Sequence, residues 1–310
     1  MTHDPSKSSG ARTPARLSAA GMPAASDGVA PAIHPTACVE PGAELGDGVR
    51  IGAFAVVGAE VELQAGVEVG PHATLLGRTR VGPECRIYPH ACLGAAPQDR
   101  EFDGEITRLE IGARTVLREH TTVNVGTTRG GGCTRIGDDN FLMNGAHVGH
   151  DCQIGDQTIV SSFCGLGGHS RVDDFAVLGA YTGLHQHARV GESVMVAGGA
   201  KVSRDAPPYS MVAGDRARIV GLNSVGLRRR GFDAETRARI KRAFHLIFQS
   251  KLRLDDALAR VEEEIGAIAE VERLVTFLRK TERGFCRFST GAGPGAEEAD
   301  ASFDPSLDRD

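Results

Sequence analysis

Residues 142–189 read LMNGAH, VGHDCQ, IGDQTI, VSSFCG, LGGHSR, VDDFAV, LGAYTG and LHQHAR when the sequence is divided every six residues. Each hexad begins with Leu, Val or Ile, and its fifth residue is small. The same repeat covers residues 33–93, 111–123 and 136–202. A branched aliphatic residue alternating with a small one, both pointing inward, fills a narrow three-sided prism built of short strands and turns.

Three hexads form one triangular coil of eighteen residues, and successive coils stack at the strand spacing of ~4.8 Å. Residues eighteen positions apart are therefore expected to lie one above another. Two segments interrupt the repeat. Residues 94–110 are polar and return in phase, which favours a functional loop over a chance surface excursion. Residues 127–134 shift the phase by one residue, and their three successive glycines suggest a flexible loop.

Beyond Val202 the apolar spacing becomes helical, with a predicted N-cap at Asp233 and further helices containing Leu254 and Val271. The sequence thus predicts a mainly β protein, in which a parallel β-helix of hexapeptide repeats precedes a small C-terminal α-helical domain. The expected organisation is a disordered extension (1–30), a β-helix domain (31–221), a helical domain (222–287) and a disordered acidic tail (288–310).

Composition narrows the functional class. The net charge of −5 gives no general attraction for nucleic acid, and the scarcity of aromatic residues, at 5% with no Trp, suits stacked turns. No apolar run reaches the ~20 residues of a membrane span, and no signal peptide is recognisable at the N-terminus. Seven cysteines without a CxxC pair argue against a disulfide framework. A cytoplasmic protein without integral membrane association is expected.

Coil register predicts a cluster of histidines. His150 is expected to lie under Gly168 and Gln186, and Asp151 under His169 and His187. A neutral imidazole accepts a proton near pH 7, and a neighbouring carboxylate fixes its tautomer, so the cluster predicts general-base chemistry. Histidines on adjacent coils also suit zinc, and a carboxylate orients metal-bound histidines equally well.

Cys152 and Cys164 occupy inward fifth positions of their hexads. We interpret both as core residues, which makes a covalent thiol mechanism improbable.

Several motifs carry a family resemblance: NGAHVGHDC at 144–152, LGGHSRVDDFAVLGAYTGLHQ at 166–186, PQD at 97–99, PPY at 207–209 and GLRRRGF at 226–232. They closely resemble the cytoplasmic UDP-N-acetylglucosamine O-acyltransferases that begin lipid A synthesis. The likeness spans about residues 33–285. It implies a left-handed β-helix and transfer of a 3-hydroxyacyl chain from acyl carrier protein to the 3-hydroxyl of UDP-N-acetylglucosamine.

The resemblance also assigns residue roles. His150 matches the general base, Asp151 its orienting partner, and the Gly168 N–H the proposed oxyanion donor. The matched substrate-binding positions are Asp99, His147, His169, His185, Gln186, Gly198, Asn223, Arg229 and Arg230. Of these, Gly198 corresponds to the position that sets acyl length. No metal and no separate cofactor are implied, because the acyl-phosphopantetheine of the carrier protein is a substrate.

In the family that the sequence resembles, the active sites lie between subunits of a homotrimer. Asp99 is therefore expected to reach its substrate across a subunit interface. A basic region suits an acidic carrier protein or a diphosphate. Its members are Lys201, Arg204, Arg216, Arg218, Arg228, Arg229 and Arg230.

Three departures from the family pattern surround the acceptor: Glu101 in place of Lys, Asn124-Val125-Gly126-Thr127 in place of HRGT, and Val225 in place of Glu. They leave open whether the acceptor is UDP-N-acetylglucosamine or its 3-amino analogue. Two other functions also remain open at this stage: a zinc-dependent, carbonic-anhydrase-like hydratase of the same fold, and a non-catalytic trimeric scaffold that binds a sugar nucleotide.

Overall fold

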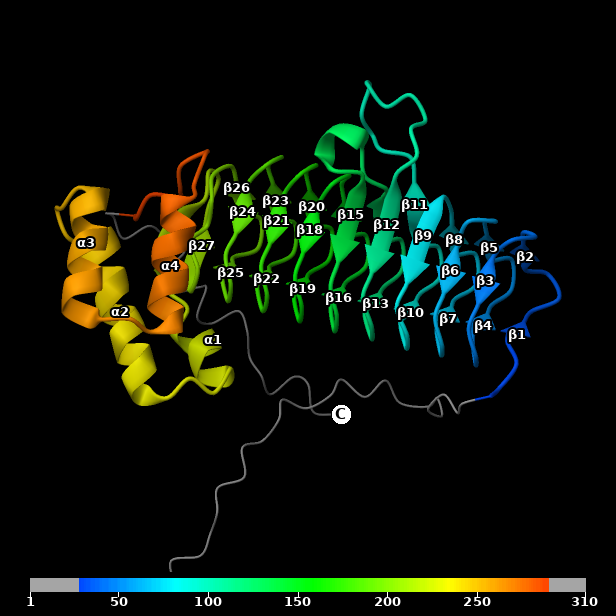
Figure 1. Ribbon diagram of the computed structural model, residues 1–310, viewed down its shortest axis with the longest axis horizontal. Coiled ribbons are helices and arrows are strands. Elements are labelled where there is room, and N and C mark those ends of the chain that lie inside the picture. The colour runs from blue at the N-terminus through cyan, green and yellow to red at the C-terminus, as the bar shows by residue number, and fades with distance from the viewer. Residues whose placement is uncertain (1–27, 290–310) are drawn as a thin grey trace, which may run out of the picture.

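From β1 (Ala32–Ile33) to β26 (Lys201–Val202), short strands pair in parallel with the strands one coil further along the chain, and the stacked coils form an elongated prism (Figure 1). The last strand, β28 (Arg218–Leu222), pairs antiparallel with β27 (Ser210–Ala213) and ends one face of the prism. Leu142 pairs with Val160, Val148 with Leu166, and Ile154 with Val172, which confirms the eighteen-residue coil. The computed structural model describes residues 28–289. Of the segments expected to be disordered, 1–30 and 288–310, residues 1–27 and 290–310 lie outside the described residues.

The prism has three faces, which we call A, B and C. Face A contains β1 (Ala32–Ile33), β4 (Arg50–Ile51), β7 (Glu68–Val69), β10 (Arg86–Ile87), β13 (Val116–Leu117), β16 (Phe141–Leu142), β19 (Ile159–Val160), β22 (Val177–Leu178), β25 (Met195–Val196), β27 (Ser210–Ala213) and β28 (Arg218–Leu222). Face B contains β2 (Cys38–Val39), β5 (Val56–Val57), β8 (Thr74–Leu75), β11 (Cys92–Ala95), β14 (Thr122–Asn124), β17 (His147–Val148), β20 (Gly165–Leu166), β23 (Gly183–Leu184) and β26 (Lys201–Val202). Face C contains β3 (Glu44–Leu45), β6 (Glu62–Leu63), β9 (Arg78–Val81), β12 (Arg108–Ile111), β15 (Cys133–Ile136), β18 (Gln153–Ile154), β21 (Arg171–Val172) and β24 (Arg189–Val190).

The core runs along the inside of the prism as one continuous cluster. In a typical two-residue strand the first side chain points outward and the second, an aliphatic residue, points inward; Leu75, Leu117 and Leu142 are 0% exposed. The fifth positions complete each layer, as the fully buried Ala146 and Cys152 show. Burial of each aliphatic side chain contributes roughly 1.5–3 kcal/mol, so the stack of coils stabilises the prism layer by layer.

Both interruptions of the repeat are loops that leave the prism and return in register. The excursion loop (residues 96–107) joins β11 to β12 and protrudes from the prism in Figure 1. The bridging loop (residues 125–132) joins β14 to β15 and contains the 3-10 helix η1 (Thr128–Gly130). Val81 still pairs with Ile111, and Ile111 with Ile136, so neither loop disturbs the stacking around it.

Four helices cover the C-terminal end of the prism (Figure 1): α1 (Ser224–Arg229), α2 (Ala234–Phe248), α3 (Leu254–Ile265) and α4 (Ala269–Arg279). The last three agree with the predicted helices, and the Asp233 carboxylate caps α2 by accepting from Thr236 N at 2.7 Å. The short α1 was not predicted. No helix within residues 28–289 combines the length and apolarity needed to cross a membrane.

Asp205 joins the prism to the helical end. Its buried carboxylate accepts from Arg189 Nε and from Thr281 Oγ1, both at 2.8 Å. The chain after α4 then returns to the prism, where Cys286 N donates to the Asp205 carbonyl oxygen at 2.8 Å and Ser289 N donates to the Ile219 carbonyl oxygen at 2.8 Å. These contacts extend two residues beyond position 287, where the sequence suggested that the helical domain ends.

Two adjacent leucines test the inward-facing pattern. Leu75 is fully buried, whereas Leu76 is 37% exposed. We expect Leu75→Ala to lower the free energy of unfolding by about 2–5 kcal/mol, because it leaves a cavity in the prism. Leu76→Ala is the matched control and is expected to change stability by less than about 0.5 kcal/mol. Chemical denaturation followed by circular dichroism measures both; equal losses would contradict the assigned core.

Candidate active site

The coil register brings the predicted histidine column together at the corner between faces B and C. Asp151, His169 and His187 occupy equivalent corner positions, with φ angles of 59°, 60° and 62°. The rings of His169 and His187 stack with centroids 4.5 Å apart and planes 4° from parallel. His150 lies edge-on to His169, with ring centroids 4.9 Å apart. The alignment of Asp151, His169 and His187 expected from sequence arithmetic is therefore confirmed.

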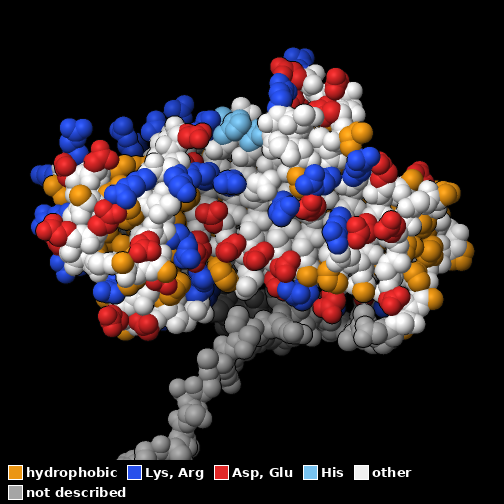
Figure 2. Space-filling model, viewed as in Figure 1, with side chains coloured by type: hydrophobic (Ala, Val, Ile, Leu, Met, Phe, Trp, Pro, Cys, Tyr) orange, Lys and Arg blue, Asp and Glu red, His pale blue; other side chains and the backbone are white. Residues whose placement is uncertain are grey.

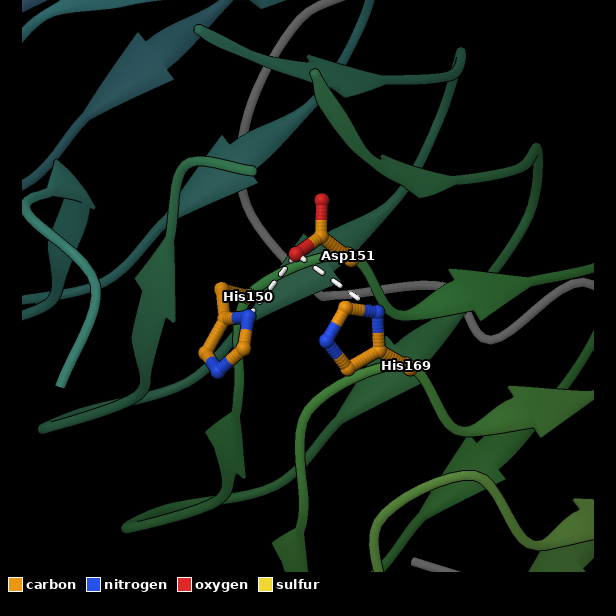
Figure 3. Close-up of side chains that lie close together, drawn as sticks. All are labelled: His150, Asp151 and His169. Atoms are coloured by element: carbon orange, nitrogen blue, oxygen red, sulfur yellow. Dashed lines mark hydrogen bonds and ion pairs between the residues drawn. The ribbon is translucent and has the colours of Figure 1, made fainter. Parts of the chain in front are cut away.

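Asp151 is a fully buried carboxylate at the centre of this column (Figure 3). Its Oδ2 lies 2.8 Å from His150 Nδ1, and 3.7 Å from His169 Nδ1. Thr127 supplies two further donors: its N–H donates to Oδ1 at 2.8 Å and its hydroxyl donates to Oδ2 at 2.7 Å. Because buried carboxylates require such donors, these bonds fix both the position and the orientation of Asp151.

His150 is held at one ring nitrogen and accessible at the other. With Nδ1 bonded to Asp151, Nε2 points away from the carboxylate, and the side chain is 16% exposed. Gly168 lies directly against the ring, since a Cβ at that position would come within 2.6 Å of Nε2. The predicted neighbours His150 and Gly168 are thus in contact, and only glycine leaves the imidazole room.

The flanking histidines are biased toward their neutral forms. Burial, with a smaller contribution from His150, lowers the pKa of His147, whose Nδ1 lies 2.8 Å from Thr122 Oγ1. Burial also lowers the pKa of His169, although the nearby Asp151 carboxylate opposes this shift. Near pH 7 these two rings therefore add little positive charge around His150.

The excursion loop brings Asp99 toward the same corner of the same chain. Its carboxylate is among the charges that act on the His169 imidazole, and Arg129 Nη2 donates to Asp99 Oδ2 at 3.1 Å. Within one chain, the Asp99 carboxylate therefore acts on the histidine column of its own subunit. A contact with the substrate across a subunit interface, expected from the family resemblance, is not required by this arrangement. Figure 2 shows the histidine side chains gathered beside the protruding loop.

The remaining predicted residues lie further along the prism. His185 and Gln186 are exposed on the coil above His169, and the His185 Nδ1 lies 2.9 Å from the Gln186 carbonyl oxygen. Gly198 is exposed one coil beyond, where a Cβ would meet the Ala180 carbonyl oxygen at 3.3 Å. A Cβ at this position would therefore be crowded against the neighbouring coil, whereas the space outside the prism stays open.

Asn223, Arg229 and Arg230 lie at the helical end and are not brought to His150 within one chain. Asn223 Oδ1 accepts from Gly226 N at 2.9 Å and caps α1, while its Nδ2 donates to the Ser193 carbonyl oxygen at 2.9 Å. Arg230 donates to Glu192 and stacks on the Phe175 ring, 3.6 Å from its centroid. Arg229 is exposed on α1.

Cys152 and Cys164 are buried, as predicted, and burial raises the pKa of the Cys152 thiol to about 11, so it is not a thiolate at neutral pH.

Thr127 was noticed in the sequence only as part of a departure from the family pattern, and Thr134, whose Oγ1 accepts from Asp151 N at 2.8 Å, was not singled out. Both belong to the segment around the bridging loop, where the repeat gives no register.

The stacked coils define the class of the protein, a hexapeptide-repeat β-helix, and two family profiles identify it as a transferase. Residues 133–168 match the family profile described as "Bacterial transferase hexapeptide (six repeats)". Residues 205–286 match the profile described as "Udp N-acetylglucosamine O-acyltransferase; Domain 2".

Full-length relatives define the particular family. An acyl-[acyl-carrier-protein]–UDP-N-acetylglucosamine O-acyltransferase of Anaeromyxobacter sp. (strain Fw109-5) is 45% identical over 256 residues, which cover 83% of this chain and 100% of the relative. The protein of the same name from Myxococcus xanthus (strain DK1622) is 46% identical over 255 residues, covering 82% of this chain and 99% of the relative. The chain belongs to this acyltransferase family.

Solved structures agree with this assignment. The UDP-N-acetylglucosamine acyltransferase from Campylobacter jejuni is 36% identical, with a TM-score of 0.79 over 83% of this chain and 100% of that chain. The enzyme from Bacteroides fragilis 9343 is 39% identical, with a TM-score of 0.80 over 82% of this chain and 100% of that chain. The expected left-handed parallel β-helix with a small helical C-terminal region is thereby confirmed.

The lowered pKa of His147 predicts a loss of stability in acid. Because its folded-state pKa lies below the ordinary value of 6.5, the unfolded chain binds the proton more readily as the pH falls through that range. We therefore expect the melting temperature to decrease between pH 7 and pH 5, and the decrease to be smaller in His147→Asn. His72, an exposed histidine on the corner between faces A and B, provides the control in His72→Asn. An identical pH dependence in all three proteins would contradict the expected shift.

Proposed function

We propose that the protein transfers a 3-hydroxyacyl chain from acyl carrier protein to the 3-hydroxyl of UDP-N-acetylglucosamine, the first step of lipid A synthesis. The observation that carries this proposal is the bond of 2.8 Å between His150 Nδ1 and the buried Asp151 carboxylate, with Nε2 facing Gly168. Membership of the acyltransferase family supports the choice of donor and acceptor.

The geometry suits general-base catalysis. Asp151 holds the proton on His150 Nδ1, so that Nε2 carries the lone pair that accepts the proton of the sugar 3-hydroxyl. The hydroxyl oxygen then attacks the thioester carbonyl carbon and forms the new C–O bond. The negative charge on the tetrahedral intermediate is stabilised by the Gly168 N–H, an interaction worth about 3–4 kcal/mol when well aligned. The C–S bond breaks, and the departing thiolate of phosphopantetheine takes the proton back from His150.

The substrate contacts follow from the same arrangement. Asp99, His147, His169, His185 and Gln186 surround the acceptor sugar, and Gly198 leaves room for the acyl chain. Asn223, Arg229 and Arg230 lie toward the nucleotide or the phosphopantetheine. Exposed arginines of the basic region, among them Arg216 and Arg228, support docking of an acidic carrier protein. We propose no metal and no cofactor beyond the substrates, and a cytoplasmic location where carrier protein and nucleotide sugar are made.

The outward side chains of the prism support a homotrimer. Face C presents charged residues such as Glu62, Arg80 and Arg171. Figure 2 shows acidic and basic side chains spread over the side of the prism that is turned to the viewer. Face A instead presents an apolar outward row along its C-terminal half: Val116, Phe141, Ile159, Val177, Met195 and Met211. On the corner between faces A and B, the exposed rings of Phe163 and Tyr181 stack 5.3 Å apart. Such contiguous apolar surface is typical of subunit interfaces.

A charge placed on face A tests the trimer. We expect Val177→Asp to reduce the mass measured by sedimentation or light scattering to that of a monomer, because a carboxylate cannot be buried in an apolar interface without a partner. The control Arg171→Asp changes the exposed face C of the same coil and is expected to leave the mass unchanged. A monomeric wild-type protein, or a trimeric Val177→Asp variant, would refute this arrangement.

The reaction itself is tested with purified protein, 3-hydroxyacyl carrier proteins of several chain lengths, UDP-N-acetylglucosamine and its 3-amino analogue, with products identified by mass spectrometry. We expect His150→Ala to lower kcat by about 10²–10⁴, the usual contribution of a general base, and Asp151→Asn to have a smaller effect. His245→Ala, which changes an exposed histidine on α2, serves as the unaffected control. Full activity in His150→Ala would rule out the proposed base.

One observation favours a second candidate function. Ligand atoms of His150, Asp151 and His169 all lie within 4.8 Å of one another, a spacing compatible with a metal ion. A zinc-dependent hydratase would lose its activity on treatment with a chelator and would regain it with Zn²⁺. For the acyltransferase we expect unchanged turnover after chelation, since Thr127 and His150 already use both carboxylate oxygens of Asp151. Turnover with any UDP-sugar would likewise exclude a purely binding scaffold.

A further inference from the structure

The bridging loop contacts two parts of the candidate site at once. At its start it meets the buried carboxylate of Asp151, and at η1 it meets the carboxylates of the excursion loop. The bridging loop itself lies outside the hexapeptide repeat, and the reaction as described above gives it no role. Its role can be read from its individual contacts.

Thr127 determines how the Asp151 carboxylate is turned. The residue is 1% exposed, and its N–H and hydroxyl donate to different carboxylate oxygens, at 2.8 Å and 2.7 Å. Two donors from one residue fix the plane of the carboxylate, which directs Oδ2 toward His150 Nδ1. Thr127 itself touches neither His150 nor the space beside Nε2 through any of these bonds, so it acts through Asp151.

The glycines of the loop make this approach possible. A Cβ on Gly130 would overlap the Asp151 carboxyl group, and a Cβ on Gly126 would lie 2.8 Å from Asp151 Oδ1. Gly131 and Gly132 adopt φ angles of 94° and 77°, which other residues rarely adopt. The sequence suggested a flexible loop. The close approaches and the backbone angles explain why glycine stands at each of these positions without invoking flexibility.

At its other end the loop holds the excursion loop. Arg129 donates to Asp99 and to Glu101, and Thr128 N donates to Glu105 Oε1 at 3.3 Å. Asp99 Oδ1 also accepts from Glu101 N at 3.1 Å, so both oxygens of Asp99 are engaged. The side chains of Arg129 and Glu101 are 59% and 68% exposed, whereas that of Asp99 is 23% exposed. Arg129 thus supplies a cation beside Asp99 from the opposite loop.

We propose that the bridging loop aligns the general base with the acceptor-binding carboxylate, and that Thr127 and Arg129 are its positioning residues. Thr127 sets the orientation of Asp151 and hence of His150, whereas Arg129 sets the position of Asp99. Because the two residues are two positions apart on one short loop, the base and the sugar contact keep a fixed relative placement. This inference rests on the proposed function.

The two ends of the loop have different kinetic signatures. Thr127→Val removes the hydroxyl donor and keeps the shape, so we expect kcat to fall about 10-fold to 100-fold, as for other residues that orient a catalytic ligand, with the acceptor KM within about twofold. Thr127→Ser retains the hydroxyl and is expected to restore most of kcat. A loss of activity caused merely by misfolding would affect both variants alike.

Arg129→Gln is expected to raise the acceptor KM about fivefold, the modest value appropriate to an exposed ion pair, while kcat and the donor KM stay within about twofold. Arg129→Lys keeps the positive charge and is therefore expected to raise the acceptor KM less than Arg129→Gln does. The control Arg135→Gln removes an exposed arginine of face C that pairs with Glu110 instead, and is expected to change none of these constants. In an Asp99→Asn background, removal of Arg129 should cause little further change.

Hydrogen exchange separates failure of this inference from failure of the proposed function. Residues 96–107 are expected to exchange faster in Arg129→Gln than in the wild type, whatever the substrate. If the wild type transfers no acyl group, the proposed function is wrong. In that case, unchanged hydrogen exchange of residues 96–107 in Arg129→Gln would also refute the role of Arg129 in holding the excursion loop. If the wild type is active, equal kcat in Thr127→Val and Thr127→Ser, or an acceptor KM unaffected by Arg129→Gln, overturns the positioning roles.

Discussion

The parallel hydrogen-bond ladder between successive coils is the constraint on which the rest of the structure depends. His169 N donates to the His150 carbonyl oxygen at 2.9 Å, and His187 N donates to that of Gly168 at 3.1 Å. Such bonds hold corner residues in left-handed backbone conformations that cost roughly 1–2 kcal/mol for a residue other than glycine. Several hydrogen bonds of the ladder together enforce these conformations. The ladder also places side chains from different coils in a column with fixed spacing. A catalytic pair is thereby built from a structural repeat.

This constraint also decides how much the sequence could predict. Wherever the hexapeptide repeat continues, position follows from counting, and the placement of His150 beside Gly168 and of His169 beneath His187 was predicted correctly. Counting fails in the two loops, because their backbone path depends on contacts that leave no periodic pattern. Thr127 and Arg129 were therefore missed as partners of Asp151 and Asp99. The short helix α1 was missed for a related reason, since six residues are too few to show helical periodicity.

Asp151 explains why a loop is needed beside a structure as regular as the prism. A buried carboxylate requires several donors, and the hydrogen bonds of the ladder already use the backbone N–H groups of the neighbouring corners. The Thr127 N–H and hydroxyl come from outside the repeat and supply the missing partners, each bond to a charged acceptor contributing about 1.5–3 kcal/mol. The lowered pKa of His169 keeps competing positive charge away from the same carboxylate. His150 remains its principal ionisable partner.

The predicted substrate contacts form two groups, one around His150 and one at the helical end around Asn223. The distance between the two groups can be compared with the length of the acceptor substrate. Asn223 is bonded to Ser193, which follows Asp151 by a little more than two coils, so the two levels are about 11 Å apart along the prism. That separation is shorter than an extended nucleoside diphosphate sugar. Arg230 is held by Glu192 and Phe175, which fixes α1 and its exposed Arg228 at this level. A sugar whose 3-hydroxyl meets His150 Nε2 therefore has the length to place its diphosphate at the level of α1. In the proposed homotrimer, packing of neighbouring subunits closes the remaining lateral distance between this corner and α1.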